Sequence, residues 1–124
     1  MIVDSGSLSV KVYDSGTTYE SQTAAIARFT AYTTLHTGLY RLGLYLVDKV
    51  NTVAGTITTR VYYTDRSGAQ GPITINATVL NGVGIASLAN QVAIYCTSGS
   101  IIEFDNTIGL FTGTYDCYFT IEAV

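Results

Sequence analysis

Apolar and polar residues alternate along most of this chain, and the alternation is clearest in residues 114–123. A period of two is the geometry of a β-strand, whose successive side chains point to opposite faces. One set of residues therefore faces a predicted core: Tyr115, Cys117, Phe119, Ile121 and Ala123. The other set faces solvent or a partner: Asp116, Tyr118, Thr120 and Glu122.

A second long strand is predicted over residues 38–47. Its core face carries Tyr40, Leu42, Leu44 and Leu46, and its other face carries Leu39, Arg41, Gly43, Tyr45 and Val47. Because both faces are largely apolar, we expect a central strand that is covered on both sides.

β-Branched and aromatic runs between turn residues predict the remaining strands. These strands span residues 8–13, 24–33, 56–64, 73–80, 92–96 and 100–104. The segment Thr97-Ser98-Gly99 has the composition of a tight hairpin, Pro72 stands at a strand entrance, and residues 85–90 are the one candidate for a helical turn. About eight short strands with regularly spaced turns are typical of a sandwich or barrel. We expect a single domain over residues 1–124, in which residues 1–13 form an N-terminal arm or strand.

Charged residues make up only 12% of the chain, about half the roughly 25% of an ordinary soluble domain. Interface cores are depleted in charge and enriched in aromatic residues in the same way. We therefore expect the outward faces to pack against other copies or another protein. The candidate interface residues are the tyrosines whose parity opposes the core set, Tyr45, Tyr62, Tyr95 and Tyr118. Alternatively, the same rings form a platform on which a sugar stacks.

Several function classes lack their signatures. The net charge of −3 and six scattered Lys and Arg residues do not form a nucleic-acid site, and no apolar run reaches the roughly 20 residues that span a membrane. No signal peptide is visible at the first residues. The single histidine, His36, is expected in an exposed loop.

No catalytic, metal or cofactor site is predicted from the titratable residues. The carboxylate pairs, such as Glu103 with Asp105, are typical of a solvated face, and the Asp-containing turns at Asp14 and Asp65 are typical of hairpin ends. Cys96 and Cys117 are expected as small buried hydrophobic residues, with a disulfide as the alternative.

Two stretches resemble known families. Gly38-Leu-Tyr-Arg-Leu-Gly-Leu-Tyr-Leu is similar to the central Gly-x-Tyr strand of trimeric jelly rolls of the tumour-necrosis-factor type. Gly113-Thr-Tyr-Asp-Cys-Tyr-Phe-Thr-Ile-Glu, and Tyr63-Thr-Asp-Arg-Ser-Gly-Ala-Gln before a Thr-rich strand, resemble small virion proteins of tailed bacteriophages. The resemblance implies an all-β fold, an antiparallel β-sandwich of the jelly-roll type.

The resemblance also implies a role. A chain of this kind is expected to be a non-enzymatic virion structural protein without a cofactor, in most cases a trimeric capsid decoration (cement) protein that contacts capsid or tail proteins. Nucleic acid and membrane are not expected as partners. The alternative is a carbohydrate-binding or receptor-binding jelly roll of a phage tail or fibre.

Overall fold

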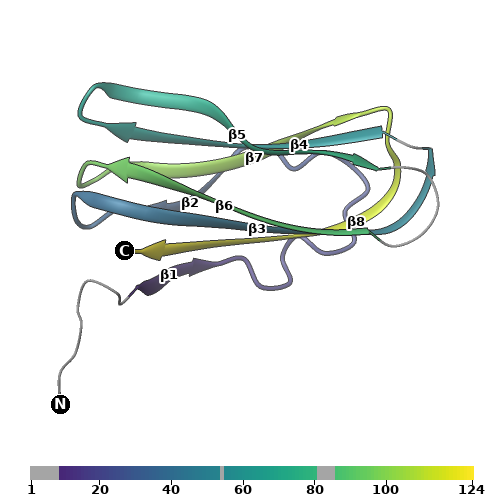
Figure 1. Ribbon diagram of the computed structural model, residues 1–124, viewed down its shortest axis with the longest axis horizontal. Coiled ribbons are helices and arrows are strands. Elements are labelled where there is room, and N and C mark those ends of the chain that lie inside the picture. Colours follow the sequence, from purple (N-terminus) through teal and green to yellow (C-terminus); the bar gives the residue numbers. More distant parts are fainter. Residues whose placement is uncertain (1–8, 54, 81–85) are drawn as a thin grey trace, which may run out of the picture.

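The computed structural model describes residues 9–53, 55–80 and 86–124, which form two four-stranded antiparallel sheets packed face to face (Figure 1). The first sheet has the order β1-β8-β3-β6 and the second has the order β2-β7-β4-β5. The strands of the first sheet are β1 (Val10–Asp14), β8 (Thr112–Ala123), β3 (Gly38–Val53) and β6 (Ala86–Cys96). Those of the second sheet are β2 (Phe29–Thr33), β7 (Ile101–Gly109), β4 (Gly55–Asp65) and β5 (Gly68–Leu80).

The pairing of the strands identifies the topology. β1 pairs with β8, β2 with β7, β3 with β6, and β4 with β5, so the first half of the chain pairs with the second half in reverse order. Successive pairs alternate between the two sheets, as in a long hairpin folded over on itself. This arrangement is the jelly roll, and it confirms the predicted all-β antiparallel sandwich.

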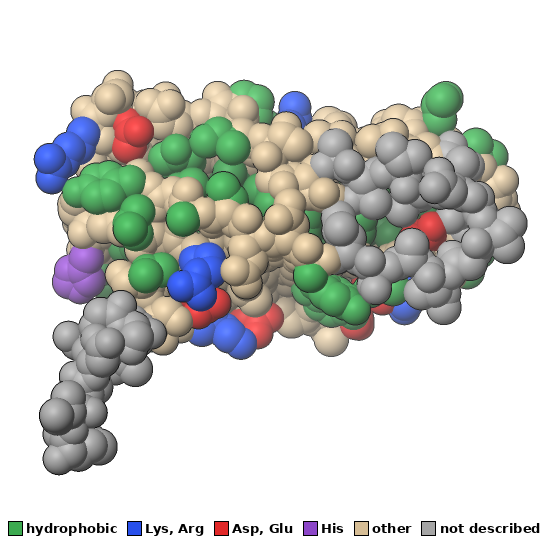
Figure 2. Space-filling view, viewed as in Figure 1, with side chains coloured by type: hydrophobic (Ala, Val, Ile, Leu, Met, Phe, Trp, Pro, Cys, Tyr) green, Lys and Arg blue, Asp and Glu red, His purple; other side chains and the backbone are tan. Residues whose placement is uncertain are grey.

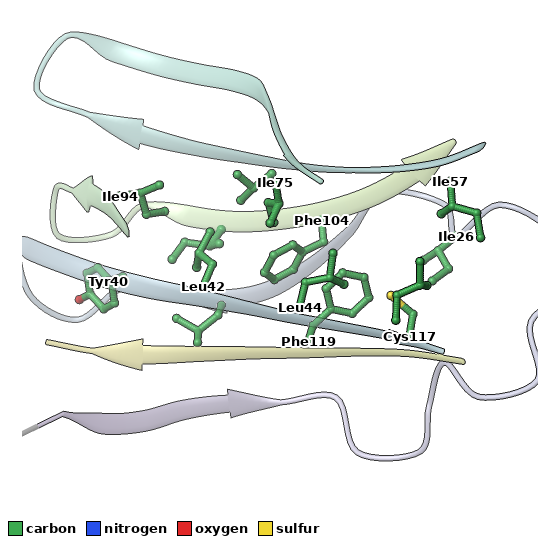
Figure 3. Packing of buried hydrophobic residues seen from close by; sticks show 14 of the residues in the cluster. Ile26, Tyr40, Leu42, Leu44, Ile57, Ile75, Ile94, Phe104, Cys117 and Phe119 are labelled. Carbon is green, nitrogen blue, oxygen red and sulfur yellow. The ribbon is translucent and has the colours of Figure 1, made fainter. Parts of the chain in front are cut away.

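The core lies between the sheets, as Figure 3 shows. Phe119 stacks against Phe104 with ring centroids 4.6 Å apart and meets Phe29 edge-on at 5.5 Å. The alternation in β8 and β3 is confirmed, since every residue assigned to the core face of 115–121 and 40–46 is buried. In each strand the side chains of opposite parity point away from the core, and most of them remain at least partly exposed.

Long-range pairing corrects two local predictions. Of the candidate helical turn at 85–90, residue 85 lies outside the described residues, and residues 86–90 are not helical but extend β6, because they pair in register with β3 from Leu44 to Asp48. The turn Thr97-Ser98-Gly99 does not close a hairpin, because β6 and β7 belong to different sheets. The turn is held by the loop between β2 and β3, because the Gly99 N–H donates a hydrogen bond to the Thr34 carbonyl at 2.8 Å.

The boundaries of several strands also differ from the prediction. β2 begins at Phe29 rather than at residue 24, and β3 continues to Val53. β5 begins at Gly68, so Pro72 lies inside this edge strand, next to a register irregularity that tolerates its missing N–H. The predicted turns at Asp14 and Asp65 are confirmed by side-chain acceptors for the N–H groups of Gly16 and Ser67.

Two predictions concerned the surfaces of the first sheet. β3 is central in the sheet, but its outer face is not covered, since Leu39 and Tyr45 are exposed. Asp116, predicted to face outward, is buried because residues 19–22 pack over it. Of the predicted arm, residues 1–8 lie outside the described residues, and β1 pairs with β8 of its own chain.

Candidate functional site

Part of the outer surface of the first sheet is rich in tyrosine and small residues, and we call it the tyrosine face; Lys11 and the Lys49–Asp116 pair border it. The ladder places Leu39 beside Tyr95, Gly43 between Gln91 and Thr120, and Tyr45 beside Tyr118, all on the side away from the core. The face comprises Leu39, Arg41, Gly43, Tyr45, Ala89, Gln91, Ala93, Tyr95, Tyr118, Thr120 and Glu122. Its two charged members, Arg41 and Glu122, lie 4.0 Å apart and pair with each other.

A depression of about 210 Å³ lies at the centre of this face. Gly43 forms its floor, and a Cβ at this position would come within 2.5 Å of Thr120 Oγ1. The rings of Tyr45 and Tyr118 stand beside it with centroids 6.1 Å apart. Further polar lining comes from Gln91 of β6 and Thr120 of β8, whereas the Asn90 amide points to the other sheet, where it donates to the Ile75 carbonyl at 2.7 Å. The depression therefore combines aromatic surface with the amide of Gln91.

Hydrogen bonds hold the Tyr118 ring in place. The Tyr118 hydroxyl donates to Glu20 Oε2 at 2.6 Å, and this bond, together with desolvation, raises the pKa of Tyr118 to about 12. Asp116, directly beneath, accepts from the Ser21 N–H at 2.7 Å and pairs with Lys49 at 3.2 Å. Because its hydroxyl is already engaged, Tyr118 offers mainly its ring to a partner.

Tyr62 lies on the opposite surface, on the outer side of the second sheet. Its ring is covered by the guanidinium of Arg28, 3.6 Å from the ring centroid, and its hydroxyl donates to Asp105 Oδ2 at 2.8 Å. Asp105 also accepts two hydrogen bonds from Arg60, and Arg28 pairs with Glu103 at 2.8 Å. These charges compensate one another, so Tyr62 belongs to a closed ionic cluster rather than to the tyrosine face.

Tyr95 lies at the end of the tyrosine face, where Arg66 donates to its hydroxyl at 3.2 Å. Three of the four predicted tyrosines thus share one face of the first sheet, and Tyr62 does not. The sequence interpretation missed Leu39 as a surface residue. The parity of Leu39, opposite to that of Tyr40, is the signal that identifies it as a surface residue, whereas the apolar residues on both faces of the strand predict a covered position.

A second concavity, which we call the end groove, has a volume of about 360 Å³. It opens at the end of the sandwich where β1 begins, β8 ends and the β2–β3 loop turns (Figure 1). Four aliphatic residues on its lining, Val10, Leu35, Leu39 and Val124, leave half or more of their surface exposed. Figure 2 shows hydrophobic side chains at this end of the molecule, interspersed with uncharged polar groups, with several basic and acidic side chains and with the histidine.

The titratable groups do not form a reaction centre in the described part of the chain. His36 is exposed in the β2–β3 loop, as predicted. Glu103 and Asp105 are each engaged by an arginine, and the predicted solvated face is wrong for Asp105, which is buried beneath Arg60 and Tyr62. Between residues 9 and 124, as far as they are described, no group of three or more His, Cys, Asp or Glu could hold a metal ion, and no helix could span a membrane.

Cys96 and Cys117 are free thiols buried in the core. This confirms the prediction that both are small buried hydrophobic residues. Burial raises the pKa of Cys96 to about 11 and that of Cys117 to about 12. In both cases the ordinary value is 9.0, so the folded protein disfavours the thiolate.

These thiols are expected to be inert at pH 8 in the native protein. A thiol reagent should modify both at least about 100-fold more slowly than in denaturant, because modification requires local or global opening. The raised pKa values also predict that the two thiols leave the free energy of unfolding unchanged below about pH 9 and lower it as the pH rises towards 11–12, because only the unfolded thiols ionise in that interval. Rapid labelling of either thiol without denaturant would contradict this.

Comparisons with known proteins agree on the fold. No protein-family model matches the chain, and no curated protein matches it. Among solved structures, the chain is similar to Eiger TNF from S. frugiperda, with 14% identity and a TM-score of 0.50 over 85% of this chain and 88% of that one. It is similar to a chain of infectious bursal disease virus, Gx strain, with 12% identity and a TM-score of 0.52 over 93% of this chain.

A third similar structure contains the CBM22-1 and GH10 modules of Clostridium thermocellum xylanase 10B complexed with xylohexaose, with 14% identity and a TM-score of 0.53 over 78% of this chain. The chain spans only 19% of that xylanase chain and 32% of the viral chain. At these identities the likeness shows a shared jelly-roll sandwich.

Proposed function

We propose that this chain is a non-enzymatic structural protein of a virus particle, which self-associates through the tyrosine face and decorates a capsid. The observation that carries the proposal is the composition of that face, on which three tyrosines and several small residues surround a single internal ion pair. Arg41 and Glu122 pair with each other, so burying these two side chains leaves neither charge unpaired, whereas burying an unpaired charge is costly. The viral structure that shares this fold supports a place in a virion.

A trimer is the state that the similarity of the β3 segment to trimeric jelly rolls implies. In a closed assembly each copy presents the same surface, and repeated weak contacts to a capsid lattice add up to high avidity. A phage head is the particle that the resemblance of the β8 segment implies.

The first test is the mass in solution, measured by light scattering on a size-exclusion column over a dilution series. Three chains of 13.2 kDa give about 40 kDa, and we expect this mass to persist on dilution. Binding to purified capsid shells that lack decoration would then test the virion role. A mass of one chain at every concentration would refute self-association.

Carbohydrate binding is the second candidate, and the depression at Gly43 favours it. Tyrosine rings can stack on a sugar ring while an amide such as that of Gln91 binds its hydroxyl groups, and the similar xylanase structure holds xylohexaose. This function predicts a monomer that binds on a glycan array and loses binding in Gln91→Ala. The matched control is Gln70→Ala on the opposite sheet, which should bind as the unaltered protein does.

A further inference from the structure

The end groove is the mouth of the core between the two sheets. Inward-facing residues of both sheets line it, Tyr32 from β2 and Tyr40 from β3, together with exposed Leu35 and Val124. The Tyr40 hydroxyl is already satisfied, since it donates to the His36 carbonyl at 2.6 Å. The groove thus presents a mainly apolar lining, and an apolar occupant would extend the hydrophobic core outward.

An unpaired strand edge borders the groove. In the described residues β1 stands at the edge of its sheet, with β8 on one side and no strand on the other. Its residues Val10 and Val12 line the groove. An extended segment laid along β1 could therefore pair with the free backbone groups and place alternate side chains in the groove, as in β-strand addition.

The chain itself supplies a segment of this chemistry. Residues 1–8 have the sequence Met-Ile-Val-Asp-Ser-Gly-Ser-Leu, which carries an apolar cluster and a short polar spacer. They join the described chain at Ser9, at the rim of the groove, where the Ser9 hydroxyl donates to Glu122 Oε2 at 2.6 Å. Eight extended residues span at most about 27 Å, which is enough to cross to an adjacent copy.

We propose that the end groove binds residues 1–8 of a neighbouring copy as a strand added to β1. This inference rests on the self-association proposed above. Residues 1–8 lead directly into β1, so in their own chain they would have to reverse direction in a tight turn to pair with it, whereas a neighbour's segment is free of that connection. Leu39 belongs to both the tyrosine face and the groove, so the two contacts form one continuous surface.

Disulfide trapping tests the exchange. Two single variants, Ile2→Cys and Leu35→Cys, are mixed, oxidised mildly and analysed by mass spectrometry of the linked peptides. Leu35 is 72% exposed, and the native thiols are buried, so the new cysteines react selectively. The expected product joins positions 2 and 35 of different chains. The matched control replaces Leu35→Cys by Ile101→Cys, an exposed position on the other sheet, and should give at least about tenfold less product.

The outcomes separate this inference from the proposed function. If the mixture forms no link between positions 2 and 35 while light scattering shows an oligomer, the arm exchange is wrong and self-association stands. If a chain carrying both substitutions forms the link only within itself, the groove binds its own segment and the inference is overturned. A monomer at every concentration refutes both.

Discussion

Replacing Tyr45 with arginine is expected to reduce the mass in solution to that of one 13.2 kDa chain, at concentrations where the unaltered protein is an oligomer. Tyr45 is 45% exposed at the centre of the tyrosine face and packs against Tyr118. An arginine here would have to be buried in the interface without a partner charge. We therefore expect the dissociation constant of the oligomer to rise by about a thousandfold or more. Light scattering over a dilution series measures it.

The control is Ile101→Arg, which adds the same charge at a position 48% exposed on the second sheet. It should leave the mass unchanged, and circular dichroism should show both variants folded. Tyr45→Phe should also remain oligomeric, because no described residue hydrogen-bonds the Tyr45 hydroxyl and the contact is made by the ring. An oligomer of unchanged affinity in Tyr45→Arg would remove the tyrosine face from the interface.

The parts of the fold that follow from alternation could be predicted from the sequence. In β8 and β3 a period of two separates buried from outward residues, and it located Phe119 and Leu42 in the core and Tyr45 outside it. This works because the pleat alone determines which residues share a face. Alternation also indicates strands well enough to give a sandwich.

The parts that depend on distant pairing could not be predicted in this way. A turn sequence such as Thr97-Ser98-Gly99 does not specify which sheet the next strand joins, and β6 residues 86–90 are extended only because β3 lies beside them. The candidate site shows the same limit. Tyr62 has the outward parity of Tyr45, but Arg28 covers its ring from a segment 34 positions earlier in the chain.

The second large effect that we expect is a loss of stability in Asn106→Leu, because Asn106 holds the segment that precedes β2. Residues 24–28 precede β2 and belong to no strand, and they are held by the side chain of Asn106 together with the bond from the Asn106 N–H to the Ile26 carbonyl at 3.2 Å. Buried Asn106 accepts from the Ile26 N–H at 2.6 Å and donates to the Tyr115 hydroxyl at 3.0 Å, and that hydroxyl donates to the Ala24 carbonyl at 2.7 Å. Leucine has a similar volume but leaves the Ile26 N–H buried without an acceptor.

We expect Asn106→Leu to lower the free energy of unfolding by about 2–4 kcal/mol, measured by urea denaturation at one fixed protein concentration. Asn90→Leu is the matched control, since exposed Asn90 also donates one hydrogen bond to a backbone carbonyl, that of Ile75, and should cost less than about 1 kcal/mol. Tyr115→Phe breaks the same hydrogen-bond network. The double variant Asn106→Leu/Tyr115→Phe should therefore lose less free energy of unfolding than the sum of the losses in the two single variants. Additive losses, or a cost below that of Asn90→Leu, would mean that Asn106 does not anchor this segment, and that the β2 edge is held by packing of Ile26 alone.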